Sequence, residues 1–182
     1  MATPSSPDHK IRVATLGDAQ AIAMVHVATW QNAYQGIVPH GYLAALDVNS
    51  RAEKWRDMLL AGTPTVLVAV QQEMVVGWIA FGPSRDEDMD QRCAEIEAVY
   101  VSPALWKQGI GTTLMNAACE RLGADGYSAV ALWVLKDNAV AQSFYARRGF
   151  EIDGSVKAIE LGGASLIEVR LSTKLHGARE AK

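Results

Sequence analysis

The spacing of apolar and polar residues predicts short strands that alternate with amphipathic helices. Apolar and β-branched runs predict strands over residues 11–14, 65–70, 74–81, 94–101 and 129–135, and a last hairpin that turns at 162–163 into a strand over 166–171. Apolar residues at helical spacing predict helices from 18 towards a stop at Pro39, over 42–46, from 49 or 50 to 62, from 109 to 123 or 126, and over 139–148. This order of elements predicts the fold class α/β (α+β) with a mixed sheet.

The length and composition fit one domain. A chain of 182 residues, 49% of them hydrophobic, can bury one sizeable core. Prolines and serines without apolar periodicity occupy the first residues, and the last ones are small and charged. We therefore expect one domain over residues 10–175, a disordered N-terminus over 1–9 and a flexible tail over 176–182.

Charge and cysteine content exclude several classes of partner. The 17 Lys and Arg nearly balance the 20 Asp and Glu, and the net charge of −3 argues against nucleic-acid binding. No apolar run approaches the roughly 20 residues of a membrane-spanning helix, and no signal peptide is evident, so we expect a cytoplasmic protein with no membrane partner. Cys93 and Cys119 form no Cys-x-x-Cys pair, and the four histidines lack the spacing of a metal site, so we expect no metal.

Residues 95–112 contain the first candidate for chemistry. A strand leads into a loop whose glycines open a helix, so free backbone N–H groups and the positive helix end can hold an anion. The Lys-Ser/Thr pair of a Walker loop is missing, and Leu114 stands where a dinucleotide fingerprint needs a small residue. An ordinary helix N-terminus with a close-packed glycine pair is the structural alternative.

Two segments together resemble the GCN5-related N-acetyltransferase (GNAT) family. Its acetyl-CoA motif, Gln/Arg-x-x-Gly-x-Gly/Ala, is matched by Gly109 and Gly111, although Trp106 stands where Gln or Arg is usual. Its second signature, Asn-x-x-Ala-x-x-Phe-Tyr-x-x-x-Gly-Phe after a strand, is matched from Asn138 to Phe150. The resemblance extends over nearly all of residues 10–173.

The resemblance implies a mostly antiparallel central sheet, flanked by helices, in which a splayed strand pair holds CoA. Acetyl-CoA is the implied co-substrate, without a metal. The implied pyrophosphate site comprises Lys107, Gln108, Gly109, Ile110, Gly111 and Thr112. The implied pantetheine and thiol site comprises Val99, Tyr100, Val101, Asn138, Phe144 and Tyr145. Capping by Asn138 and core packing of Phe144 are the structural alternatives.

The resemblance also assigns a proton donor to Tyr145, whose phenol stays protonated at neutral pH because its ordinary pKa is near 10. Alternation along the strand predicts that Glu95 and Glu97 share a face with Val99. Carboxylates in a central strand are costly to bury without a task or a partner. We expect Glu97 to be the base that deprotonates the amine through water, with Glu95 as the second candidate. Alternatively, one or both attract a cationic acceptor or pair with a buried arginine.

Aromatic residues in the first helix are candidates for the acceptor site. His26, Trp30 and Tyr34 follow one helical stripe, and we expect Trp30 and Tyr34 to bind substrate, although such a stripe is more often core. The acidic stretch over residues 86–90 could steer an amine, but a solvated loop is the simpler expectation.

These observations predict an N-acetyltransferase that moves an acetyl group from acetyl-CoA to a primary amine of a small molecule in a ternary complex. Two alternatives stay open: a protein or peptide N-acetyltransferase, and a non-catalytic acyl-CoA-binding sensor. Apolar edges in the final hairpin could also pair two copies as a homodimer.

Overall fold

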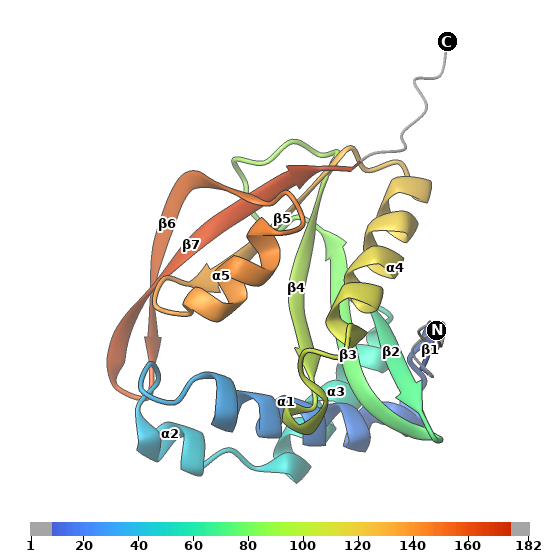
Figure 1. Ribbon diagram of the computed structural model, residues 1–182, viewed down its shortest axis with the longest axis vertical. Helices are drawn as coiled ribbons and strands as arrows, with labels where there is room; N and C mark the ends of the chain where they lie inside the picture. Colours follow the sequence, from blue (N-terminus) through green and yellow to red (C-terminus); the bar gives the residue numbers. More distant parts are fainter. Residues whose placement is uncertain (1–8, 176–182) are drawn as a thin grey trace, which may run out of the picture.

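The computed structural model describes residues 9–175, and all its strands form one seven-stranded sheet in the order β1-β2-β3-β4-β5-β7-β6 (Figure 1). The strands are β1 (Lys10–Val13), β2 (Thr65–Gln71), β3 (Met74–Pro83), β4 (Cys93–Val101), β5 (Ala129–Leu135), β6 (Glu151–Leu161) and β7 (Ala164–Lys174). The helices are α1 (Ala19–Ala33), α2 (His40–Ala44), α3 (Val48–Ala61), α4 (Ile110–Ala124) and α5 (Ala139–Ala146), with short 3-10 turns at Leu16–Asp18 and Pro103–Leu105. Of the disordered N-terminus predicted over residues 1–9, residues 1–8 lie outside the described residues, and so does the flexible tail predicted over 176–182.

The sheet is antiparallel except between β4 and β5. These two central strands pair in parallel over only three positions, Cys93 to Glu95 against Ala129 to Ala131. Beyond Glu95 the two strands separate, and Figure 1 shows β4 and β5 diverging towards the end of the sheet that carries α1 and α2. The predicted α/β (α+β) class, mostly antiparallel sheet and splayed strand pair are therefore confirmed.

Two layers of helices cover the sheet. One apolar cluster joins α4 to the sheet around Leu114, Ile79 and Ile96, each at most 2% exposed. The second joins α1 and α3 to the opposite face around Ile22, Trp55 and Trp78. A smaller third cluster joins the α1–α2 region to the β6–β7 hairpin. Burial of one stripe of each long helix accounts for the helical periodicity of the sequence.

Helix ends follow local capping chemistry. The Asp47 side chain accepts a hydrogen bond from the Ser50 amide at 2.8 Å and starts α3, and Gly62 ends it in the left-handed region at φ 72°. The first long helix ends at Ala33 rather than near Pro39, because the chain turns through Gly36 at φ 77°.

The prediction that side chains alternate strictly between the two faces along β4 is wrong. Ile96 lies in the α4-side cluster together with Val99, whereas Ala98 packs on the α1 and α3 side. The pairing with β3 shifts here, since Ala80 faces Ala98 but the next residue, Phe81, faces Ile96. Glu97 is therefore the extra residue of a β-bulge, which breaks the face shared by Glu95, Glu97 and Val99 that alternation predicted.

The acidic loop between β3 and β4 is not simply solvated. Arg170 of β7, which is 5% exposed, reaches Asp86 at 3.0 Å and Asp88 at 2.7 Å in this loop. It also reaches Asp153 of β6 at 2.7 Å. One guanidinium thus ties the loop to the last two strands. Within residues 9–175, no helix has both the length and the apolar character needed to cross a bilayer.

Candidate active site

A cavity of about 840 Å³ opens where β4 and β5 separate. Its walls come from the end of β4, the start of α4, α5 and the end of α1. All the predicted cofactor residues except Gln108 line it: Val99, Tyr100, Val101, Lys107, Gly109, Ile110, Gly111, Thr112, Asn138, Phe144 and Tyr145. The fold thus gathers residues from positions 99 to 145 around one cleft.

The main chain of β4 faces this opening at Val99 and Val101. The Ser102 amide donates to the Val76 carbonyl of β3 at 2.8 Å, which sets the phase of the antiparallel ladder. Because hydrogen-bonded positions alternate, Tyr100 bonds to β3 while Val99 and Val101 point away from it. The Val101 carbonyl accepts from Thr29 Oγ1 at 3.0 Å and Trp106 Nε1 at 2.7 Å. An extended ligand in the cleft would therefore form hydrogen bonds with the main chain of Val99 and with the Val101 amide.

The start of α4 is shaped by two glycines. Gly109 adopts φ 85°, a left-handed conformation that other residues rarely take, and turns the chain into the helix. A Cβ atom at Gly111 would lie 3.3 Å from the Phe144 ring, so a glycine lets α4 and α5 approach closely. The first amides of α4 lack intrahelical partners and carry the positive end of the helix dipole. This N-terminus can accept a phosphate.

Asn138 and Tyr145 are placed by α5. The Asn138 side chain accepts from the Ala141 amide at 3.1 Å, so it caps this helix and also lines the cleft. The Tyr145 ring packs edge-on against Phe144, with ring centroids 5.3 Å apart. Burial raises the pKa of the Tyr145 phenol above its ordinary value. The phenol is therefore protonated at neutral pH.

The two predicted carboxylates differ in their environment. Glu95 is buried and receives three hydrogen bonds from Arg85, including one of 2.6 Å from Nη2 to Oε1. The side chain of Glu97 is 20% exposed and lies 3.4 Å from Arg85 Nη1. Burial raises the pKa of Glu97, while Arg85 opposes the shift. The carboxylate of Glu97 is thus held by fewer contacts than that of Glu95. Neither glutamate lines the 840 Å³ cavity.

The predicted substrate aromatics occupy different positions. Tyr34 lines the cavity, and burial raises the pKa of its phenol. Trp30 does not line it; its ring packs edge-on against Tyr34 with centroids 5.1 Å apart, and its buried indole N–H has no hydrogen-bond partner in the structure. Within residues 9–175, no group of three or more His, Cys, Asp or Glu side chains could hold a metal ion.

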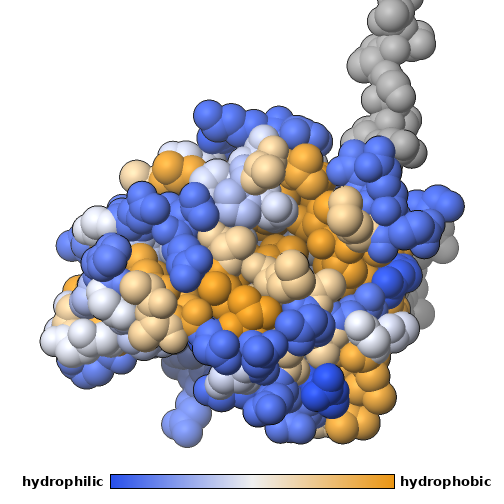
Figure 2. Space-filling model, turned by 90° about the horizontal axis from the view of Figure 1, so that it is seen from below, coloured by the Kyte–Doolittle hydropathy of each residue, from blue (hydrophilic) through white to orange (hydrophobic). Residues whose placement is uncertain are grey.

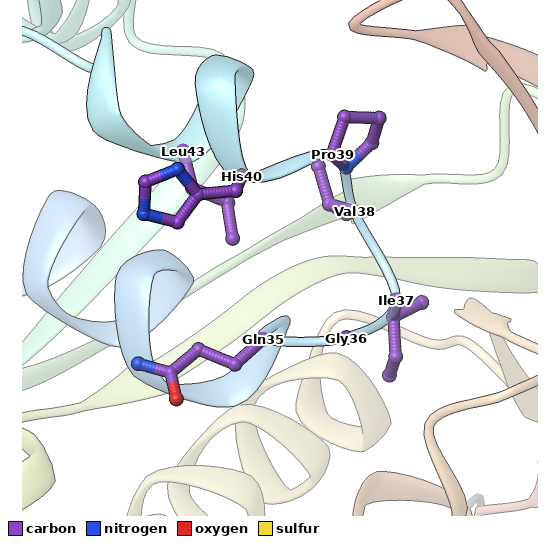
Figure 3. Close-up of a pocket in the computed structure, with 7 residues that line it drawn as sticks. All are labelled: Gln35, Gly36, Ile37, Val38, Pro39, His40 and Leu43. Carbon is purple, nitrogen blue, oxygen red and sulfur yellow. The ribbon is translucent and has the colours of Figure 1, made fainter.

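A second hollow lies where α1 passes into α2 (Figure 3). Its residues run from Gln35 to Leu43, and only Gln35 and His40 have polar side chains there. Figure 2 views the end of the molecule that carries these helices, where apolar residues form a band bordered by hydrophilic ones. This hollow has no acidic or nucleophilic side chain, so the cleft between β4 and β5 is the better candidate for catalysis.

Sequence reasoning missed several residues of the cleft. Thr29 and Trp106 fix the end of β4 through the Val101 carbonyl. Arg148 lies against the start of α4, where it donates to the Thr112 hydroxyl. The available signal was the basic pair Arg147-Arg148 within the second motif segment.

A strand pair that opens beside a glycine-led helix N-terminus defines a class of transferases that take their acyl group from a CoA thioester. The chain belongs to the acetyltransferase (GNAT) family, whose model matches residues 22–150. The predicted family and enzyme class are therefore confirmed, and acetyl-CoA is the co-substrate of the family.

Relatives in bacteria agree with this membership. The chain is 33% identical over 165 residues to an uncharacterized N-acetyltransferase, YuaI, of Bacillus subtilis; the match covers 86% of this chain and 93% of that protein. It is 32% identical over 149 residues to the mycothiol acetyltransferase of Brachybacterium faecium, covering 80% of this chain and 42% of that protein.

Solved structures share the fold. The PaiA N-acetyltransferase of Thermoplasma acidophilum, crystallised with coenzyme A, has a TM-score of 0.73 at 22% identity, covering 91% of this chain and 98% of that one. The structure of YncA of Salmonella typhimurium, an acetyltransferase with its cofactor acetyl-CoA, has a TM-score of 0.65 at 22% identity. The match covers 96% of this chain and 99% of that one. These comparisons support the fold of the chain and leave its acceptor open.

Proposed function

We propose that this protein transfers the acetyl group of acetyl-CoA to a primary amine of a small molecule by direct attack in a ternary complex. The observation that carries this proposal is the separation of β4 from β5 beyond Glu95, which leaves Val99 and the Val101 amide facing the same cleft as Tyr145. The thioester supplies an activated acetyl group, and the protein holds it beside the amine.

Binding of the CoA moiety would use the same elements. The first amides of α4, from Gly109 to Thr112, bind the diphosphate, with Lys107 and Gln108 at its margin. The pantetheine extends along Val99 to Val101 as an added strand. Asn138 and Phe144 border it from α5.

The contact between the β6–β7 hairpin and α2 favours a small substrate. The β6–β7 hairpin packs against α2 so tightly that a Cβ atom at Gly162 would lie 2.6 Å from the Tyr42 Cβ. Leu161 and Leu166 pack with Leu43 in the same apolar cluster. In the proposed complex, this contact would hinder an extended peptide that carries an internal lysine, whereas a small amine needs no passage past it. Tyr34 lines the cleft, and Trp30 packs against the Tyr34 ring.

Glu97 is the proposed base. An ammonium with an ordinary pKa near 10 must lose a proton before its nitrogen can attack. The carboxylate of Glu97 takes this proton through water, and its raised pKa makes it a better base than an exposed glutamate. Glu95 acts as a positioning residue because it holds Arg85, which in turn lies beside Glu97.

Val99 and Tyr145 complete the proposed reaction. As the amine nitrogen bonds to the acetyl carbon, the Val99 amide stabilises the negative charge on the carbonyl oxygen. The carbon–sulfur bond then breaks, and the Tyr145 phenol donates its proton to the sulfur. The nitrogen loses a second proton to solvent as it becomes an amide. One of the two protons that the ammonium has lost restores the phenol through solvent and the other is released, so the products are the acetylated amine, the CoA thiol and one proton.

The direct test is CoA thiol release from acetyl-CoA in the presence of polyamines, amino acids, aminoglycosides, aryl amines or short peptides. We expect release with one class of small amine, and Tyr145→Phe should lower kcat about 100-fold while acetyl-CoA affinity changes little. Equal losses in kcat and affinity would contradict the role of Tyr145. Thiol release with peptides alone would favour a protein acceptor. Binding of acetyl-CoA without thiol release would favour a non-catalytic sensor.

The pH profile tests the base. Because Glu97 must be deprotonated, kcat should fall as the pH drops through its raised pKa. Glu97→Gln should remove this acidic limb and lower kcat at neutral pH. An unchanged acidic limb in the variant would assign it to another group.

A further inference from the structure

We propose that Arg148 binds the diphosphate of CoA and holds it against the start of α4; this inference rests on the proposed function. Arg148 follows α5 and lines the cleft. Its Nη1 donates to the Phe144 carbonyl at 2.6 Å, and its Nη2 donates to the Thr112 hydroxyl. Because Thr112 lies in the first turn of α4, the guanidinium stands at the positive end of that helix.

This guanidinium has no counter-ion within the described chain. No carboxylate of residues 9–175 lies within 4.0 Å of it. The other arginines that the fold holds by several hydrogen bonds each face a carboxylate: Arg12 faces Asp18, Arg85 faces Glu95, and Arg170 faces three aspartates. Arg148 is thus a fixed cation without a carboxylate partner among residues 9–175.

The surroundings favour an anion strongly. The Nε atom of Arg148 is buried and has no hydrogen-bond partner in the structure. Burial lowers the pKa of the Arg148 guanidinium, and the neighbouring Arg147 lowers it further. A positive helix end and a second cation both repel the guanidinium in the free protein. A doubly charged diphosphate would relieve this repulsion and accept from guanidinium and amides together.

The position of the guanidinium is set in advance. It stacks on the Phe144 ring, with Cζ 3.6 Å from the ring centroid. The same ring is 3.3 Å from the position of a Cβ at Gly111, so α4, Phe144 and Arg148 form one packed layer beside the cleft. Trp106 cannot supply this contact, because its one polar atom is bonded to the Val101 carbonyl. Little side-chain entropy would be lost when Arg148 binds phosphate.

Equilibrium binding of three ligands by calorimetry tests this assignment. CoA carries the diphosphate and the 3′-phosphate, 3′-dephospho-CoA keeps only the diphosphate, and pantetheine lacks both. We expect Arg148→Gln to weaken CoA and 3′-dephospho-CoA equally, by about 10- to 100-fold, and to leave pantetheine unchanged. Arg148→Lys should recover part of the loss. Arg121→Gln, at the other end of α4, is the matched control, with a loss below about threefold for 3′-dephospho-CoA because its side chain is exposed and does not line the cleft.

Each other outcome overturns the assignment. An equal loss for pantetheine would mean that Arg148 only supports Phe144, and a loss for CoA but not for 3′-dephospho-CoA would move the contact to the 3′-phosphate. Unchanged binding of CoA in Arg148→Gln would remove the contact while leaving the proposed function intact. If the unmodified protein binds no CoA, the proposed function fails and this inference with it.

Discussion

Replacing Arg170 with methionine should be among the most damaging single changes outside the cleft. Methionine roughly preserves the length of the side chain but removes a guanidinium that is 5% exposed. It would leave Asp86 and Asp153 without the hydrogen bonds of 3.0 and 2.7 Å that now neutralise them. The loop between β3 and β4 would also lose its attachment to β6 and β7.

The magnitude follows from the burial of the partners. The side chains of Asp86 and Asp153 are each 21% exposed, so both hydrogen bonds form in a partly dry setting. Charge-assisted bonds of this kind contribute about 1.5–3 kcal/mol each, so the loss of two gives about 3–6 kcal/mol in the free energy of unfolding. Asp88 is exposed and is left out of this sum. Urea unfolding at pH 7 measures the difference through the shift in midpoint.

The pH dependence of unfolding tests whether charge causes the loss of stability in Arg170→Met. Burial alone would raise the pKa of Asp153, but hydrogen bonds from Ser155 and Arg170 outweigh it and lower this pKa overall, so the ion pair with Arg170 stabilises the fold above the unfolded pKa near 4 and is lost as the pH falls through the folded pKa. The difference between the native protein and Arg170→Met should therefore shrink below pH 4. Lys157→Met is the control on the same strands, because its pair with Glu168 is more exposed and should be worth about 1 kcal/mol or less. A difference that is independent of pH would show that packing, not charge, accounts for the loss.

Two further changes test other parts of the fold. Asp18→Asn should lower the free energy of unfolding by about 2 kcal/mol at pH 7, because the hydrogen bond from Arg12 lowers the pKa of Asp18 to about 2. This loss should disappear as the pH falls from about 4 to 2. A urea midpoint that the substitution shifts equally at pH 7 and at pH 2 would refute this origin. Gly162→Ala combines φ 60° with a contact of 2.6 Å to Tyr42, so it should lose at least about 1 kcal/mol and raise KM for the amine more than KM for acetyl-CoA, measured by thiol release.

Local pattern was enough to predict most elements of this fold. The strand predicted over residues 129–135 has those bounds in the structure, because an apolar run between Gly126 and Asp137 leaves little freedom at either end. The helix predicted over 139–148 ends at Ala146, since Arg148 leaves the helix to reach the start of α4. Element ends are therefore least predictable where a side chain has a tertiary partner.

Contacts between distant residues explain what the sequence did not reveal. Asp86 and Asp88 resemble a solvated acidic run, but their cation is Arg170, which lies 84 and 82 residues away in the chain. For Glu95 and Glu97, the sequence offered pairing with a buried arginine only as an alternative and did not identify the arginine. The partner of Glu95 is Arg85, 10 positions away, whose side chain is 62% exposed. No local signal distinguishes such a pair from two independent surface charges.

The bulge at Glu97 links fold to chemistry most directly. In a regular ladder that kept the pairing of Ile96 with Phe81, the main chain of Glu97 and Val99 would bond to β3. Ala98 and Tyr100 would then face the opening. The one-residue shift instead turns the main chain of Val99 and Val101 towards the cleft. A central strand normally has no free edge, so a ligand can add to β4 only because β5 leaves it after three paired positions. The bulge and the separation must therefore occur together to create the binding edge, and neither is encoded in the spacing of β4 alone.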